Sequence, residues 1–107
     1  MNYLSTRDRA LRVSSAEAVK LGLSRDGGLL TPEAIPQIDS AFLDSLSKCS
    51  YQERTARVMA LYLTDYTEEE LKTCIASAYD SKFDTKEIAP IVEADGAYYL
   101  ELFHGAT

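Results

Sequence analysis

The sequence predicts a small α+β domain with an opening strand, about four helices and a C-terminal β-hairpin. Three observations carry this prediction: a short aromatic strand-like start, capping boxes ahead of three helical stretches, and a change in apolar period after Asp84. The 107 residues are enough for one modest core and too few for two. Residues 1–107 are therefore expected to form a single domain.

The chain is predicted to open with a strand and a short helix. The stretch "NYL" is apolar and aromatic enough for a strand, and the polar turn "STRDR" follows it. Ser14 and Glu17 have the spacing of a capping box, in which each side chain satisfies a backbone donor of the helix start. Gly22 is placed to terminate this helix.

The next segment, "LSRDGGLLTPEAIPQI", is predicted to be an ordered loop. Asp26 is followed by Gly27 and Gly28, and two consecutive glycines permit positive φ and a close approach of the backbone to another group. Pro32 and Pro36 impose extended geometry on the residues before them.

Three further helices are predicted in the middle of the chain. Asp39 is a plausible cap for the first, while Ser50 with Glu53 and Thr67 with Glu70 form capping boxes for "SYQERTARVMALYL" and "TEEELKTCIASAYDSKF". Apolar residues recur at helical spacing in the last two and predict core-facing stripes. The stripes are Val58, Leu61 and Tyr62, and Leu71, Ile75, Ala78 and Tyr79.

A β-hairpin is predicted at the end of the chain. Asp95-Gly96 lies between the apolar and aromatic runs of "PIVEADGAYYLELF" and is a strong signal for a type I′ turn. Alternation would place Leu100 and Leu102 on one face and Glu101 and Phe103 on the other, and the hairpin is expected to end at His104.

Composition and charge exclude several classes of protein. A net charge of −6 argues against a nucleic-acid binder, and no apolar run approaches the length that spans a bilayer. The N-terminus carries arginines where a signal peptide would need an apolar region, so a cytoplasmic location is expected. Cys49 and Cys74 lie far apart, without a CxxC motif and with a single histidine, so they are expected to be small buried apolar residues rather than metal ligands.

The positive charge is concentrated at the start of the chain. Five basic residues (Arg7, Arg9, Arg12, Lys20 and Arg25) and two acidic residues (Asp8 and Glu17) give residues 1–25 a balance of 5 − 2 = +3. Such a cluster can steer a small anionic ligand, or it can be a solvated face that offsets acidic neighbours.

Three groups of residues are candidates for binding. Two hydroxyls and a guanidinium at Ser5, Thr6 and Arg7 suit a phosphate or carboxylate, or simply form a polar turn. The glycine pair at 27–28 can present N–H groups to an anion or form a tight turn, and no nucleotide-binding glycine motif is present. His104 can act as a base, a ligand or a structural hydrogen-bonding group.

Taken together, the motifs resemble the N-terminal region of threonine synthases, pyridoxal-phosphate enzymes of the fold type II group. "YLSTR", "SAEAVKLGLSRDGGLLTPEAIP", the Tyr51 helix and "LELFHGAT" occur in the family's order, so the resemblance covers essentially the whole chain. Ala106 departs from the usual proline of the family, and Asp8 stands where a glycine commonly follows Ser-Thr-Arg. The most specific portions are Ser5-Thr6-Arg7, Asp26-Gly27-Gly28-Leu29 with Pro32, and Glu101-Leu102-Phe103-His104-Gly105.

The resemblance implies that the chain is part of a larger α/β enzyme that converts O-phosphohomoserine and water to threonine and phosphate with pyridoxal phosphate. In the family, the lysine that binds the cofactor follows the His-Gly motif by a few residues. None of the chain's five lysines is at that position, so residues 1–107 are expected to hold no catalytic residue, to bind no pyridoxal phosphate alone and to be inactive. The implied substrate-binding residues are Ser5, Thr6, Arg7, Asp26, Gly27 and Gly28, and the implied cofactor-binding residues are His104, Gly105 and Thr107.

Partners follow from the same resemblance. The remaining domains of the enzyme would cover an apolar patch that the isolated chain exposes, and this patch would favour self-association. The alternative is a self-contained acidic module that binds a protein partner through its helices and has no catalytic activity.

Overall fold

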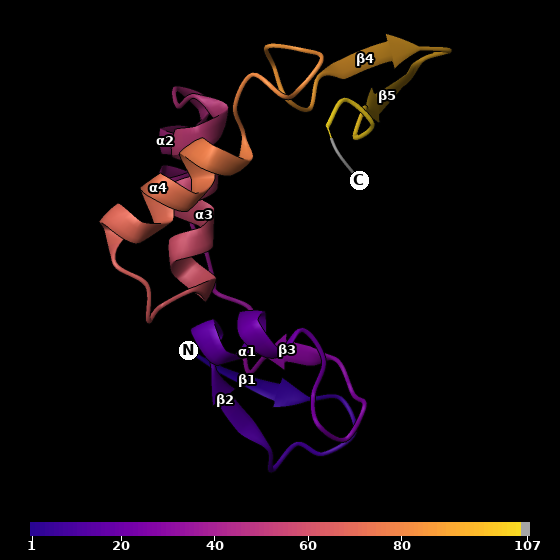
Figure 1. The fold of residues 1–107 in the computed structure, drawn as a ribbon. Helices are drawn as coiled ribbons and strands as arrows, with labels where there is room; N and C mark the ends of the chain where they lie inside the picture. Colours follow the sequence, from indigo (N-terminus) through magenta and orange to yellow (C-terminus); the bar gives the residue numbers. More distant parts are fainter. Residues whose placement is uncertain (106–107) are drawn as a thin grey trace.

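The computed structural model describes residues 1–105 and has the predicted α+β architecture (Figure 1). It has four helices, a three-stranded sheet and a two-stranded sheet. In chain order the elements are β1 (Asn2–Ser5), β2 (Arg12–Ser14), α1 (Ser15–Leu21), β3 (Leu30–Pro32), α2 (Ser40–Ser47), α3 (Tyr51–Tyr62), α4 (Glu68–Ala78), β4 (Ile91–Ala94) and β5 (Ala97–Leu100). Helix α1 lies within the three-stranded unit, and the other three helices separate the two sheets.

The N-terminal sheet has the order β2-β1-β3 and is antiparallel throughout. Tyr3 pairs with Val13 on one side, and Leu4 pairs with Thr31 on the other. The polar turn was predicted correctly as a connection, but β2 and β3 were not predicted, and β3 lies within the segment expected to be an ordered loop. Each has three residues, too few for an alternating pattern, and each is an edge strand, where Pro32 is tolerated.

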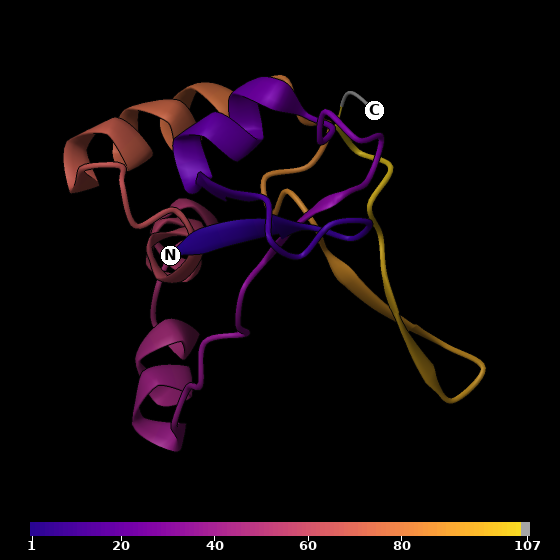
Figure 2. The ribbon, with the colours of Figure 1, turned by 90° about the horizontal axis from the view of Figure 1, so that it is seen from below.

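The apolar core is small and is centred on the helices. The buried apolar residues are Leu4, Ala18, Leu46, Leu71, Ile75 and Ile88. Leu71 and Ile75 of α4 confirm the predicted stripe, whereas Ala78 is exposed and α4 ends there, before Phe83. On α3, Leu61 and Tyr62 are half-buried and Val58 is exposed. Helices α3 and α4 pack side by side and form the centre of the molecule (Figures 1 and 2).

The cysteines correct one expectation. Cys49 is half-buried, and its thiol donates to Ser45 O, but Cys74 is exposed on α4. Cys74 lies three residues after buried Leu71 and one before buried Ile75, so helical spacing places it at the border of the packed stripe. Spacing alone therefore did not predict that this cysteine is exposed.

The predicted hairpin turn is confirmed. Asp95 and Gly96 have φ of 52° and 74°, which are the two positive values that a type I′ turn requires. The strands end at Leu100 rather than at His104, so the alternation expected for residues 100–103 does not extend past the strand. Every residue of β4 and β5 is exposed.

The molecule is elongated, with principal extents of 44 × 28 × 28 Å. The N-terminal sheet with α1 lies at one end, the hairpin at the other, and α2, α3 and α4 lie between them (Figure 1). No helix among residues 1–105 is long and apolar enough to cross a membrane.

Side-chain caps define the helix starts. The two complete boxes, Ser50 with Glu53 and Thr67 with Glu70, form as predicted. At α1 the Ser14 hydroxyl accepts a hydrogen bond from Glu17 N. A second backbone donor of this helix start, Ala16 N, donates to the carboxylate of Asp65 in the α3–α4 connection. The latter bond ties α1 to the helical pair.

We expect Ser50→Ala and Thr67→Ala each to lower the free energy of unfolding by about 1 kcal/mol, because each removes an acceptor from an N3 backbone donor. Urea denaturation followed by circular dichroism at 222 nm measures the loss. Ser81→Ala, an exposed serine outside the helices, is the control and should leave the midpoint unchanged. Equal stability of all three variants would contradict the capping role.

Candidate functional site

The end of β1 and the loop of residues 24–29 form the first candidate site. Ser5 is only 1% exposed, and its hydroxyl donates to the carboxylate of Asp26, with both oxygens at 2.8 Å. The same Ser5 oxygen accepts from Arg7 N at 3.1 Å. The Ser5 hydroxyl therefore makes its hydrogen bonds within the chain, and these bonds fix the backbone of the two residues that follow it.

The loop itself is a tight turn that depends on glycine. Gly27 has φ of 78°, its N–H donates to Ser24 O, and Ser24 N donates to Gly28 O. This bonding matches a three-residue hairpin loop in which a glycine forms the bulge. A Cβ on Gly28 would lie 2.3 Å from Ser5 Oγ and 3.1 Å from Arg7 N. Only glycine at position 28 lets the loop approach β1 this closely.

Thr6 and Arg7 lie on the exposed side of the same contact. Thr6 exchanges two hydrogen bonds with Leu29: its N–H donates to Leu29 O at 2.9 Å, and its hydroxyl accepts from Leu29 N at 3.0 Å. One guanidinium nitrogen of Arg7 donates to Asp26 O at 3.1 Å. We name residues 5–7 and 26–28 the Ser-Thr-Arg corner. This corner presents the Thr6 hydroxyl and the Arg7 guanidinium on a backbone that is held in place by hydrogen bonds.

Asp26 carries the negative charge of this corner. Its carboxylate accepts from Gly28 N at 2.9 Å and from Ser5 Oγ, and these bonds, that from Gly28 first, lower the pKa of Asp26 below its usual value. The neighbouring Arg7 adds to this effect. Asp26 therefore stays ionised at neutral pH and serves to hold the loop, while Arg7 and Thr6 offer the donors that an anion needs.

The second candidate site is the segment around His104. His104 Nε2 lies 2.7 Å from a carboxylate oxygen of Glu101, and both side chains are mostly buried. Gly105 lies against the ring of Phe83, since a Cβ there would be 2.3 Å from Phe83 Cε1. Sequence reasoning missed both partners: Glu101 was placed on a strand that ends before it, and Phe83 was placed in a helix that ends before it. Thr107, the third predicted residue, lies outside the described residues.

The structure does not bring the two candidate sites together. The Ser-Thr-Arg corner belongs to the sheet at one end of the molecule, whereas in the chain His104 follows the β4–β5 hairpin, which lies at the other end (Figure 1). Each predicted group is local and ordered, and neither completes a site with the other among residues 1–105.

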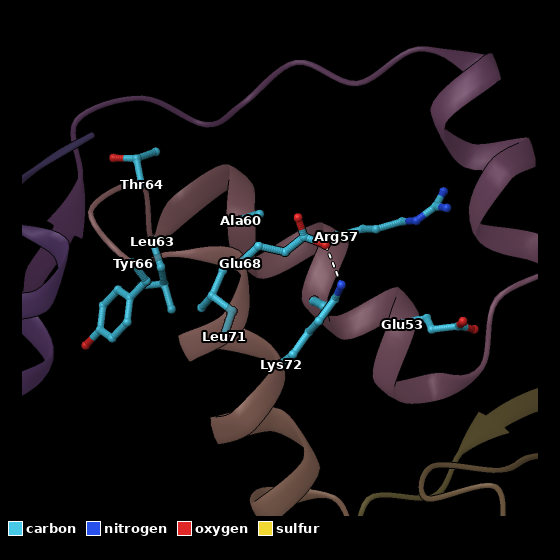
Figure 3. Close-up of a pocket in the computed structure, with 10 residues that line it drawn as sticks. Glu53, Arg57, Ala60, Leu63, Thr64, Tyr66, Glu68, Leu71 and Lys72 are labelled. Carbon is cyan, nitrogen blue, oxygen red and sulfur yellow. Dashed lines mark hydrogen bonds and ion pairs between the residues drawn. The ribbon is translucent and has the colours of Figure 1, made fainter.

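A groove of about 540 Å³ lies between α3 and α4, away from both candidate sites (Figure 3). Its floor includes Ala60 and Leu71. Its cations already have partners, because Lys72 is paired with Glu68, and Arg57 donates to Ser45 Oγ at 2.9 Å. No three His, Cys, Asp or Glu side chains in the described part of the chain gather to hold a metal ion. The groove thus has no set of groups arranged for chemistry.

Replacing Asp26 by Asn should change how stability depends on pH. The folded-state pKa is lowered, so the carboxylate stabilises the fold above its unfolded pKa of about 3.9, and this contribution is lost as pH falls through the folded value. Asp26→Asn should therefore be less stable than the unaltered chain at pH 7, and the difference should shrink below about pH 4. Urea denaturation at several pH values measures this. Asp44→Asn, on the exposed face of α2, is the charge-matched control, and a pH-independent difference at Asp26 would contradict the expectation.

The comparisons with known proteins all point to one family. A family model described as "Threonine synthase N terminus" matches residues 2–79. Threonine synthase of Schizosaccharomyces pombe is 38% identical over 110 residues, covering 100% of this chain and 21% of the relative.

Solved structures agree with the sequence relatives. The crystal structure of threonine synthase from yeast has a TM-score of 0.84 and 36% identity, covering 97% of this chain and 22% of that one. A pyridoxal-phosphate-bound threonine synthase from Brucella melitensis has a TM-score of 0.86 and 30% identity, covering 99% and 23%. This chain spans about a fifth of the length of the relatives it matches. Because the family model covers well over half of its residues, the chain belongs to the threonine synthase N-terminus family.

Proposed function

We propose that this chain is the N-terminal part of a longer, cytoplasmic threonine synthase that converts O-phosphohomoserine and water to threonine and phosphate. The observation that carries the proposal is agreement along the whole chain, in sequence and in fold, with threonine synthases of which it covers only 21–24%. The isolated chain is then inactive. The reactive lysine lies beyond Thr107.

The residues present fit a supporting role beside pyridoxal phosphate, which supplies an electron sink when bound. The His104 ring is fixed by Glu101, and the face of Gly105 is closed by Phe83, so both residues hold the chain that leads to the cofactor. Two of the lysines have surface partners: Lys72 is paired with Glu68, and Lys82 with Asp80. Neither is arranged as a reactive amine.

The Ser-Thr-Arg corner binds or borders the substrate in this proposal. A phosphorylated amino acid carries a phosphate and a carboxylate, and Arg7 with Thr6 offers donors suited to either group. The other residues of the corner support binding indirectly, because they fix the backbone that carries these donors. They are Ser5, Asp26, Gly27 and Gly28. The local excess of positive charge favours approach of an anion.

The remaining domains of the same chain are the proposed partner of the hairpin. Ile91 and Tyr98 on the hairpin, and Leu102 and Phe103 just after it, are 66–77% exposed, which concentrates apolar surface at this end of the chain. Covered by those domains, this surface stabilises the intact enzyme. In the isolated chain it favours self-association.

The gene's complete reading frame tests the proposal. We expect the frame to continue past Thr107 into a segment with a lysine, and the full-length protein to take up pyridoxal phosphate with a cofactor absorbance band and to release phosphate from O-phosphohomoserine. The 107-residue chain should show only non-specific imine with the cofactor and no turnover. A stop codon after Thr107 would instead favour the acidic interaction module, whereas turnover by the short chain would contradict both the proposal and that alternative.

Arg7→Ala in the full-length enzyme should raise KM for O-phosphohomoserine or lower kcat, with kcat/KM falling about tenfold or more, because a charge-assisted hydrogen bond is lost. Steady-state phosphate release measures this. Arg9→Ala is the matched control: it removes the same charge two residues away, so equal losses in both variants would indicate general steering rather than a specific contact. Unchanged kinetics in Arg7→Ala would refute the assignment.

A further inference from the structure

We propose that Phe83 is a positioning residue that clamps Gly105 and thereby sets where the chain enters the cofactor site. The inference rests on the proposed function. We name Phe83, Asp84 and Pro90 the Phe83 clamp, since all three contact the segment 101–105 from the connection between α4 and β4.

The contact with Gly105 leaves no room for a side chain. A Cβ at this position would lie 2.3, 2.6 and 2.9 Å from three carbons of the Phe83 ring, well inside contact distance. Gly105 is not among the glycines with positive φ, so backbone conformation does not explain the residue. The nearby Phe83 ring explains why glycine stands at position 105. The ring occupies the space that a side chain at position 105 would need.

Backbone hydrogen bonds hold the same segment from the same side. Asp84 N donates to His104 O at 3.0 Å, and Glu101 N donates to Pro90 O at 2.9 Å. Together with the bond between His104 and Glu101, they fix the segment at both of its ends. The ring contact and the hydrogen bonds thus act on one short stretch of chain.

Phe83 is itself anchored to the helical pair. Its ring lies 5.7 Å from that of Tyr79, which lies 5.1 Å from Tyr51 in an edge-on arrangement. Gln52 Nε2 donates to Tyr79 O at 2.8 Å. The row of rings connects α3 and the end of α4 to Gly105. A displacement of these helices would therefore shift the position of residues 101–105.

The connection that carries Phe83 is under local strain. Ile88 has φ of 66°, a conformation that is rarely adopted by a β-branched residue, and it is only 6% exposed. Such a conformation persists only where the surrounding structure enforces it, and it is typical of segments that hold a functional group in place. Burial of Ile88 thus accompanies an enforced backbone conformation in the same connection that carries Phe83.

In the proposed enzyme, residues 104–107 lead to the cofactor-binding lysine. A Cβ at Gly105 would push the segment away from Phe83 and shift whatever follows it. Small displacements of reacting groups cost large factors in rate because the geometry of approach is lost. Loss of the clamp should therefore lower cofactor affinity and kcat, and leave KM for O-phosphohomoserine nearly unchanged.

A double-mutant cycle in the full-length protein tests the clamp. Gly105→Ala should weaken the affinity for pyridoxal phosphate, measured by absorbance titration, about tenfold and lower kcat by a similar factor. Phe83→Leu has a smaller effect alone and makes room for the new methyl group. The double variant should therefore bind the cofactor better than Gly105→Ala alone, and Tm of the cofactor-free protein should show the same rescue.

Phe42→Leu on α2 is the matched control: it makes the same substitution at a half-buried phenylalanine and should not rescue Gly105→Ala. Additive losses in the cycle, or unchanged cofactor binding in Gly105→Ala, would overturn the clamp. Failure of the proposed function can be distinguished from failure of the clamp, because in the former case the unaltered full-length protein would bind no pyridoxal phosphate. The coupling in Tm would still decide whether Phe83 and Gly105 are in contact.

Discussion

The buried hydroxyl of Ser5 is the contact on which the N-terminal half of the structure depends. It joins the end of β1 to the loop of residues 24–29 through Asp26, and it leaves no space for a side chain at Gly28. That loop leads directly into β3, so the same contact places the third strand beside β1. The exposed donors of Thr6 and Arg7 are ordered because a residue that faces inward fixes the backbone before them.

The distribution of apolar residues explains why order in this chain relies on such polar contacts. Among residues 1–105 only six apolar residues are buried, whereas fifteen large apolar or aromatic side chains are exposed to a third of their area or more. A core of that size contributes little to stability against the entropy of ordering the chain. Caps, turns and short hydrogen-bonded contacts therefore define the local shape, and the exposed apolar surface is suited to burial against further protein.

Local signals in the sequence predicted the parts of the fold that local chemistry determines. The boxes at Ser50 and Thr67 and the turn at Asp95-Gly96 involve residues within four positions of each other, so composition and spacing are sufficient. Strands β2 and β3 exist because β1 lies between them, and a three-residue strand carries no period of its own. The clamp at Gly105 likewise joins residues 22 positions apart. Residue chemistry singled out Ser5-Thr6-Arg7, the glycine pair and His104 as candidates, the resemblance implied their roles, and the structure identified their partners.

The separation of the two candidate sites limits what residues 1–105 can do alone. The Ser-Thr-Arg corner offers donors for an anion but no group poised to move a proton, since Asp26 is held ionised by Gly28 and Ser5. The segment at His104 has a histidine, but its ring is already paired with Glu101. Each set is held by its own local hydrogen bonds, one beside the N-terminal sheet and one after the C-terminal hairpin. Within residues 1–105, neither set therefore combines donors for an anion with a side chain that is free to move a proton.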